Sequence, residues 1–211
     1  MKKIVVLASG RGSNFQSLID NIESGYIQGK IALLIVNKED AGAIDRAKKH
    51  KIKWEFVDPK GYDTREAYDQ KLVDVIHKTK GDLICLAGWM RILSPQFVDA
   101  FPNQIINIHP SLLPAFGGGV HAQEDAFQHS VKISGCTVHF VTNEVDGGPI
   151  IIQAAVPVME DDDADKLKAR ILKQEHKIYP KAVKLFCEDK LMVEGRRVAI
   201  KEDTGFLFTS A

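Results

Sequence analysis

The chain has 211 residues, 45% of them hydrophobic and 27% charged, which is typical of an ordinary globular protein built around one large domain. Its 28 Lys and Arg residues balance 28 Asp and Glu residues, so no excess of positive charge favours nucleic acid or an anionic membrane as a partner. No apolar run approaches the length of a membrane span, and three widely spaced cysteines, Cys85, Cys136 and Cys187, indicate a reducing compartment, so we expect a cytoplasmic protein.

Apolar, strand-like runs alternate with helical patterns through the first half of the chain. The first strand is predicted over 3–8, because the apolar run from Ile4 to Ala8 is too short for a signal peptide and a glycine-rich turn follows it. Four more strands are predicted over 31–37, 52–58, 82–88 and 104–108, and helices over 13–23, 41–49, 64–79 and 94–101. Mostly apolar strands that alternate with helices indicate βαβ units and a parallel sheet that is covered on both faces.

The pattern changes in the second half. Two strands are predicted over 136–142 and 149–158, and the short turn NEVDGG between them indicates an antiparallel pair. A helix over 164–186 follows, and then short strands around a turn, LMVEGRRVAI and GFLF. The sequence thus predicts a single α/β domain over 1–211: a doubly wound, mostly parallel, Rossmann-like sheet with an antiparallel strand pair toward the C-terminal half and short strands in 191–211.

The first candidate site is the glycine-rich turn ASGRGSN, which joins the first strand to the first helix. Its glycines let backbone N–H groups approach an anion, and the helix N-terminus adds partial positive charge. A dinucleotide-binding turn would need a third spaced glycine and an acidic residue after the second strand, where this chain has Asn37 and Lys38. A phosphate monoester therefore fits best. The alternative is a purely structural turn, in which Ser13 and Asn14 suit the role of helix caps.

Polar or aromatic residues also follow the later strands. The stretch AGWMRILS (87–94) ends the fourth strand and belongs either to an aromatic pocket or to ordinary core packing. Asn107 and His109 alternate at the end of the fifth strand, so both point to the same face before Pro110 ends the strand. Asp146 lies in the turn VDGGP, whose alternative interpretation is an ordinary hairpin turn.

These candidate residues are expected to meet, because an open parallel sheet binds its ligand outside the carboxyl ends of its strands. No Ser or Cys occupies a nucleophile elbow, and Cys136 and His139, three apart on a strand, face opposite sides and cannot readily share a metal ion. The remaining amide, imidazole and carboxylate suit acyl transfer between two bound substrates. The non-enzymatic alternative is a phosphate- or nucleotide-binding module, which binds without turnover.

Motifs along nearly the whole chain match one family. They are SGRGSN, REAYD, AGWMRILSP, NIHPSLLPAF, TVHFVTNEVDGGPII and QEHKIYP. Through them the chain resembles the folate-dependent formyltransferases, and its small size and phosphate-type first loop resemble the glycinamide ribonucleotide transformylases in particular. The resemblance implies transfer of the formyl group of 10-formyltetrahydrofolate, a co-substrate, to the amine of glycinamide ribonucleotide in de novo purine synthesis. The products would be formylglycinamide ribonucleotide and tetrahydrofolate, and no metal is expected.

The resemblance also implies roles for individual residues. The catalytic set would be Asn107, His109 and Asp146. The substrate-binding residues would be Gly12, Ser13, Asn14 and Glu175, and the folate-binding residues Arg65, Met90, Arg91, Ile92, Leu93 and Asn107. A phosphate-binding half would span about 1–100, and a folate-binding and catalytic half about 101–190. The role of Glu175 rests on the resemblance alone, because the helical pattern by itself predicts a solvated residue there.

Two related enzymes and one departure from the family pattern complete the interpretation. A formyltetrahydrofolate hydrolase would carry an extra N-terminal domain, and a methionyl-tRNA formyltransferase would have a longer chain with a basic surface. The triple glycine Gly117–Gly119 departs from the family pattern and is expected to form a lid or a flexible connection. His121 is left outside the catalytic set, and His139 is expected to be structural. We expect small-molecule substrates as partners, no nucleic acid or membrane, and a monomer or homodimer.

Overall fold

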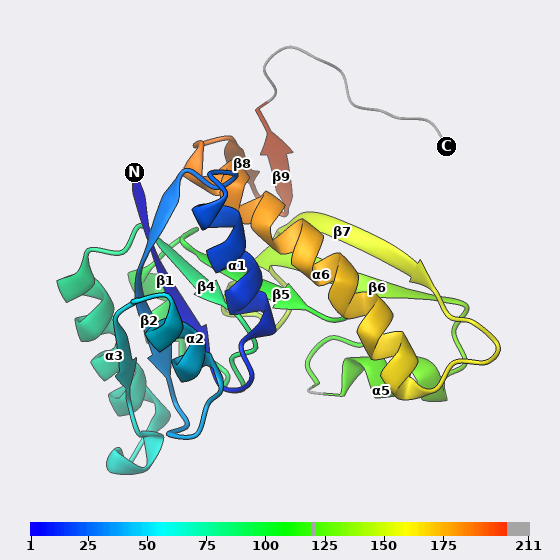
Figure 1. Cartoon of the computed structure of the whole chain (residues 1–211), viewed down its shortest axis with the longest axis horizontal. Helices are drawn as coiled ribbons and strands as arrows, with labels where there is room; N and C mark the ends of the chain where they lie inside the picture. Colours follow the sequence, from blue (N-terminus) through cyan, green and yellow to red (C-terminus); the bar gives the residue numbers. More distant parts are fainter. Residues whose placement is uncertain (120, 202–211) are drawn as a thin grey trace.

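A seven-stranded sheet forms the centre of the protein in this computed structural model, which describes residues 1–119 and 121–201 (Figure 1). The strand order is β3-β2-β1-β4-β5-β6-β7; β1 to β5 are parallel, and β6 runs antiparallel to both β5 and β7. The strands are β1 Lys2–Ala8, β2 Gly29–Val36, β3 Trp54–Phe56, β4 Leu83–Leu86, β5 Ile105–His109, β6 Ile133–Phe140 and β7 Ile150–Pro157. The predicted doubly wound, mostly parallel sheet with an antiparallel pair is therefore confirmed.

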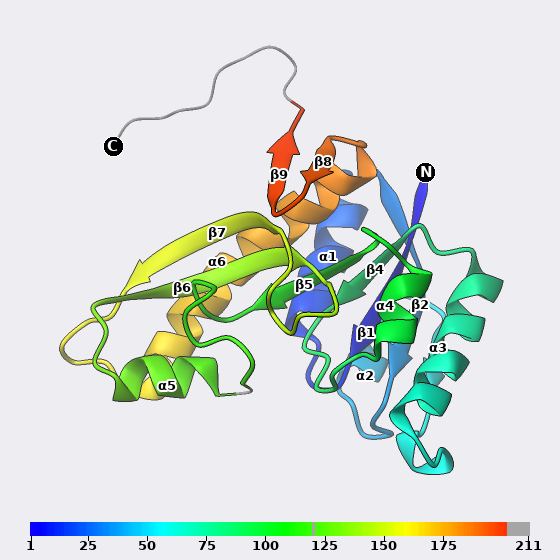
Figure 2. The same ribbon diagram turned by 180° about the vertical axis from the view of Figure 1, so that it is seen from behind.

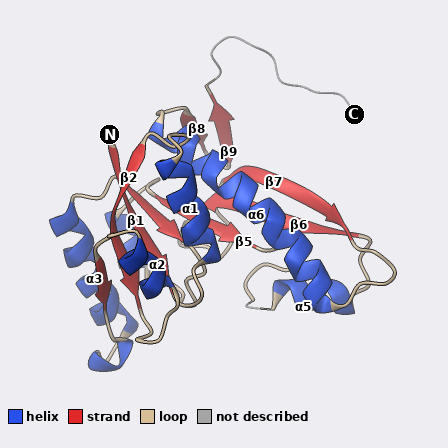
Figure 3. Ribbon diagram, in the orientation of Figure 1, coloured by secondary structure: helices blue, strands red, loops and turns tan. Residues whose placement is uncertain are grey.

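Helices cover both faces of this sheet (Figure 3). They are α1 Ser13–Glu23, α2 Ala43–Lys49, the short 3-10 helix η1 Pro59–Gly61, α3 Arg65–Thr79, α4 Pro95–Ala100, α5 Ala122–Gln128 and α6 Ala164–Cys187. The alternation of side chains along β1 explains the two layers. Ile4, Val6 and Ala8 pack in one core with α1, α2 and α6, whereas Val5 and Leu7 pack in a second core with α3 and α4. Figure 2 shows the α3 and α4 layer from the side opposite to Figure 1.

The long helix α6 is fixed to the sheet by Tyr179, which is fully buried. Its hydroxyl oxygen lies 3.0 Å from the carbonyl oxygen of Leu86 on β4 and 3.2 Å from that of Ile106 on β5, and it donates to this pair of acceptors. Because Leu86 is the last residue of β4, the contact sets the position of α6 beside the carboxyl ends of the central strands.

Several predicted elements differ from the observed ones. The third strand was predicted over 52–58 but covers Trp54–Phe56, because only these residues pair with β2, and the flanking apolar residues made the run look longer. Helix α5 was not predicted; its buried residues are only Ala122 and Ala126, which give a weak apolar pattern. The tail forms a separate antiparallel pair, β8 Leu191–Glu194 and β9 Arg197–Ile200, as expected, while the predicted strand GFLF lies outside the described residues.

Candidate active site

The strand order places a topological switch point beside β1. The chain proceeds from β1 to β2 and β3 on one side and then crosses to β4 and β5 on the other, so the carboxyl ends of β1, β4 and β5 lie next to one another. Ligands of open α/β sheets bind in the crevice at such a point. The turn after β1, the 88–94 loop (residues 88 to 94, between β4 and α4) and the end of β5 therefore share one edge, as the sequence predicted.

His109 and Asp146 meet in this crevice, although they are far apart in the sequence. The Nδ1 atom of His109 lies 3.4 Å from the Oδ2 atom of Asp146, and the His109 side chain is only 7% exposed. On its other side, Nε2 of His109 lies 3.1 Å from the carbonyl oxygen of Phe116. Oδ2 of Asp146 also accepts a hydrogen bond from the backbone N–H of Gly118 at 2.8 Å. Both ring nitrogens of His109 thus face oxygen acceptors.

Asn107 joins this pair through a histidine that the sequence analysis assigned to structure alone. His139 lies opposite Asn107 in the β5–β6 ladder, and its Nε2 atom is 3.2 Å from Nδ2 of Asn107 and 3.7 Å from Oδ1 of Asp146. Its Nδ1 lies 2.9 Å from the carbonyl oxygen of Phe140, which requires a proton on Nδ1 and leaves the Nε2 lone pair to accept from the Asn107 amide. Burial lowers the pKa of His139, which favours this neutral form. His139 is thus a site residue that orients the Asn107 amide.

The glycine-rich turn leads into the N-terminus of α1. Gly12 is the N-cap residue and has a left-handed φ of 71°, and a Cβ atom there would lie 2.8 Å from Cβ of Ala43. The expectation that Ser13 and Asn14 cap the helix is wrong: they are its first two residues, and the N-cap residue Gly12 has no side chain to accept from the first N–H groups of α1. These groups and the helix dipole leave partial positive charge at the turn, and the first turn holds no acidic residue.

Asn14 and Glu175 form a buried pair next to this turn. Nδ2 of Asn14 donates to Oε2 of Glu175 at 2.7 Å, and the Glu175 side chain, on α6, is 5% exposed. Burial raises the pKa of the Glu175 carboxyl, while the hydrogen bond from Asn14 opposes the rise. Oδ1 of Asn14 is buried and has no hydrogen-bond partner among the described residues. The pair is therefore a polar surface that a ligand can complete.

His109 also lines an apolar pocket of about 400 Å³. Its wall includes the 88–94 loop, Asn107, His109, His139 and Asp146. The predicted folate-binding residues Met90, Arg91, Ile92 and Leu93 all line it, but Arg65 does not; the Arg65 guanidinium instead lies 3.2 Å from a carboxylate oxygen of Glu66. The indole Nε1 of Trp89, another lining residue, is buried without a hydrogen-bond partner in the described chain.

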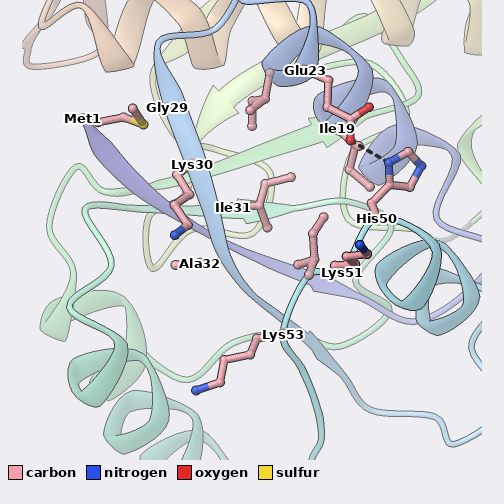
Figure 4. Close-up of a pocket in the computed structure, with 12 residues that line it drawn as sticks. Met1, Ile19, Glu23, Gly29, Lys30, Ile31, Ala32, His50, Lys51 and Lys53 are labelled. Atoms are coloured by element: carbon pink, nitrogen blue, oxygen red, sulfur yellow. Dashed lines mark hydrogen bonds and ion pairs between the residues drawn. The ribbon is translucent and has the colours of Figure 1, made fainter.

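Two other hollows lie away from the strand carboxyl ends. One, of about 410 Å³, is bordered by α1, β2 and residues 50–53; its polar groups are exposed lysines and the 2.7 Å contact between His50 and Glu23 (Figure 4). The second, of about 560 Å³, lies between β2, β3 and α3. Neither contains any predicted site residue. Within the described ranges no cluster of three His, Cys, Asp or Glu side chains is arranged for a metal, and no helix there could cross a bilayer.

Comparisons with known proteins match the part of the chain that builds this crevice. The family described as "Formyl transferase" matches residues 2–183. The phosphoribosylglycinamide formyltransferase of Escherichia coli (strain K12) is 43% identical over 188 residues, which cover 89% of this chain and 88% of that protein. A crystal structure of glycinamide ribonucleotide transformylase 1 from Symbiobacterium toebii has a TM-score of 0.94 and 48% identity, covering 96% of this chain and 95% of that one. The trifunctional purine biosynthetic protein adenosine-3 of Homo sapiens is 39% identical over 203 residues, which cover 95% of this chain but 20% of that protein.

Proposed function

The chain belongs to the formyl transferase family, and we propose that its crevice transfers the formyl group of 10-formyltetrahydrofolate to glycinamide ribonucleotide, with Asn107, His109 and Asp146 as the catalytic residues. The observation that carries the assignment of these residues is the contact of His109 with Asp146, at 3.4 Å, between an anion-binding turn and an apolar pocket. The reaction is a step of de novo purine synthesis and yields formylglycinamide ribonucleotide and tetrahydrofolate.

The ribonucleotide occupies the side of the crevice formed by α1 and α6. The backbone N–H groups of Gly12, Ser13 and Asn14 hold its phosphate, which gains from the positive end of the α1 dipole. The carboxylate of Glu175, held by Asn14, accepts hydrogen bonds from the glycinamide ribonucleotide. These contacts bring the substrate amine toward Asn107 and His109. The phosphate-binding residues Gly12, Ser13 and Asn14 thus belong to the predicted half over about 1–100, and Glu175 of α6 lies outside it.

The folate occupies the apolar pocket. The aromatic and apolar walls receive its ring system, and backbone groups of residues 90–93 read the edge of the pterin. The orphaned Nε1 of Trp89 offers one more donor. Arg65, at the start of α3, does not line the pocket, so its role in folate binding stays a prediction. The wall draws on both predicted halves of the chain, because residues 88–93 belong to the half over about 1–100, while Asn107, His109 and Asp146 belong to the half over about 101–190.

The chemistry follows from the placement of the three catalytic groups. The neutral amine of the ribonucleotide attacks the formyl carbon, and an oxyanion develops on the formyl oxygen as the new C–N bond forms. One N–H of the Asn107 amide is held by His139, so the second N–H is free to donate to the oxyanion. His109 adds a second donor when its Nε2 turns from the Phe116 carbonyl toward the oxyanion. Collapse of the intermediate breaks the bond to the folate nitrogen as His109 gives that nitrogen a proton, and the proton lost by the amine then restores the proton on His109. The carboxylate of Asp146 holds the imidazole of His109 in position and stabilises the positive charge that it carries in the reaction.

The test is the formation of tetrahydrofolate from 10-formyltetrahydrofolate with and without glycinamide ribonucleotide. We expect release that depends on the amine and stoichiometric formation of the formylated ribonucleotide. Equal release in the absence of the amine would identify a hydrolase, and tight binding of both ligands without release would identify a binding module; either result would overturn the proposal. The sequence-based expectations of a cytoplasmic location, of a monomer or homodimer, and of no nucleic-acid or membrane partner stay predictions.

A further inference from the structure

The 88–94 loop forms a wall of the apolar pocket, and its shape therefore matters for whatever binds there. Met90 within it is 57% exposed and has little packing to hold it in place. The first end of the loop is fixed by Ser9 at the end of β1. The N–H of Ser9 donates to the carbonyl of Gly88 at 3.0 Å, and the hydroxyl of Ser9 accepts from the N–H of Met90 at 2.8 Å.

The other end of the loop is fixed by Asp69, a residue of α3 with no assigned role. Oδ2 of Asp69 accepts from the backbone N–H of Ser94 at 2.6 Å, and Asp69 is only 2% exposed. Ser94 is itself fully buried, and its hydroxyl accepts from the N–H of Phe97, which makes it the N-cap of α4. One carboxylate thus fixes both the last residue of the loop and the start of the next helix.

The neighbour of Asp69 on α3 holds a second point of the loop. The guanidinium of Arg91 lies over the ring of Tyr68, 4.7 Å from its centroid, and the Tyr68 hydroxyl donates to the carbonyl of Val57 at 3.2 Å. Tyr68 is buried, so the ring is a fixed support for the Arg91 side chain. Consecutive residues of one helix therefore contact the middle and the end of the loop.

A buried carboxylate is costly, and core packing alone does not explain it. Burial raises the pKa of Asp69, whereas the backbone and side-chain hydrogen bonds from Ser94 and the charge of Arg91 lower it. An apolar residue at this position would avoid the cost of burial but would leave the Ser94 N–H without an acceptor. The buried carboxylate is thus explained by the hydrogen bond that it accepts from the Ser94 N–H at the end of the loop.

We propose that Asp69 is a positioning residue for the formyl folate: by binding the Ser94 amide it sets the 88–94 wall of the pocket, so that its loss weakens folate binding and leaves ribonucleotide binding intact. The inference rests on the proposed function for the identity of the ligand. It does not place Asp69 in contact with substrate, since Asp69 does not line the pocket. Among the described residues Asp69 makes no hydrogen bond to Gly12, Asn14 or Glu175, and Ser9, which joins the loop to the ribonucleotide side, contacts the end of the loop opposite to Asp69.

Three variants test this role. Asp69→Ala removes the acceptor, Asp69→Asn keeps an oxygen that accepts from the Ser94 N–H, and Asp74→Ala is a matched control. Asp74 lies on the same helix, is exposed, and accepts one hydrogen bond from Gln70 at 2.9 Å. For each variant we would measure kcat, KM for both substrates, the Kd of 10-formyltetrahydrofolate by calorimetry, and amide hydrogen exchange.

In Asp69→Ala we expect KM and Kd for the formyl folate to rise roughly ten- to hundredfold, as for a displaced positioning group, with KM for the ribonucleotide changed less than about threefold. Amide exchange should become faster over residues 88–98 and stay unchanged in α6. Asp69→Asn should recover most of the folate affinity, and Asp74→Ala should change each quantity by less than about threefold.

The outcomes separate this inference from the proposed function. Unchanged folate Kd in a folded Asp69→Ala variant, or an equal loss of affinity for both substrates, would overturn the positioning role while the wild-type activity stands. If Asp69→Ala does not fold, Asp69→Leu, which fills the space of the side chain and also lacks an acceptor for the Ser94 N–H, is measured in its place, and an unchanged folate Kd in that variant would overturn the role. Wild-type protein that binds folate without transferring the formyl group would overturn the function alone, and the Kd values would still decide the role of Asp69. Wild-type protein that fails to bind folate would overturn both.

Discussion

Replacing Asp146 with Asn tests the charge at the centre of the site. Oδ2 of Asp146 lies 3.4 Å from Nδ1 of His109, and the Asp146 side chain is 14% exposed. A full charge pair at this distance is worth about 5 kcal/mol at an effective dielectric constant of ~20. Asn keeps the shape of the side chain, and its amide oxygen can still accept the hydrogen bond from the Gly118 N–H. The substitution therefore removes mainly the negative charge.

The expected loss is set by the part of this energy that acts only in the transition state. Partial exposure of Asp146 reduces the Coulomb term, and losing one oxyanion stabiliser typically costs about 2.7–4 kcal/mol. We therefore expect kcat to fall about a hundred- to a thousandfold, with smaller changes in both KM values.

The assay is steady-state formation of tetrahydrofolate, with circular dichroism and thermal unfolding to show that the variant is folded. Asp99→Asn is the matched control, because Asp99 is exposed and accepts a hydrogen bond from Nδ2 of Asn143 at 3.1 Å outside the catalytic set. A folded Asp146→Asn protein whose kcat falls less than about tenfold would refute the reasoning, since it would show that the charge on Asp146 is not needed in the transition state.

Three further substitutions test the scaffold around the site. Tyr179→Phe removes the hydroxyl that binds two backbone carbonyls of β4 and β5, and should lower the free energy of unfolding by about 1–3 kcal/mol in urea titrations; no change would show that water satisfies these carbonyls. Gly12→Ala places a Cβ 2.8 Å from Cβ of Ala43 at a positive φ, and should raise KM for the ribonucleotide more than KM for the folate. Burial lowers the pKa of His139, so the unfolded chain binds the extra proton and the stability should fall as pH drops below about 6.5. In His139→Gln this part of the decline should be absent from unfolding curves measured between pH 7 and about 5, and an unchanged slope would contradict the assignment.

The meeting of the strand ends could be predicted from the sequence, because the geometry of a parallel sheet decides it. Apolar runs with helices between them imply parallel strands, and the carboxyl ends of parallel strands share one edge of the sheet for any conformation of the loops. Asn107 and His109 followed from this rule together with the two-residue period of a strand. Asp146 was a weaker candidate from spacing alone, and it gained its place from the resemblance and then from its 3.4 Å contact with His109.

The place of His139 in the site and the burial of Glu175, which was expected to be solvated, depend on contacts between distant segments. His139 faces Asn107 only because of the register of β5 against β6, which no local pattern determines. The helical spacing nevertheless does predict the burial of Glu175. It follows Ile171 by four residues and precedes Ile178 by three, so it lies on the apolar stripe of α6 and is buried with it. A carboxylate in such a stripe indicates a polar partner, which here is Asn14.

The capping of α1 shows a different limit. Ser13 and Asn14 are residue types that often cap helices, but the left-handed Gly12 takes that position and shifts both of them into the first turn. The choice depends on the close approach of Ala43, a residue of α2, which leaves no room for a side chain at position 12. Short motifs therefore identified the turn, whereas the role of each residue within it required the packing around it.

The central claim is that His109 acts in the chemical step while other groups bind the substrates. The most direct measurement is a comparison of wild type and His109→Ala by substrate binding at equilibrium and by single-turnover formyl transfer with enzyme in excess. In His109→Ala we expect the dissociation constants of both substrates to change little and the transfer rate to fall at least about a hundredfold. A transfer rate close to that of the wild type, or a loss confined to substrate binding, would contradict the claim.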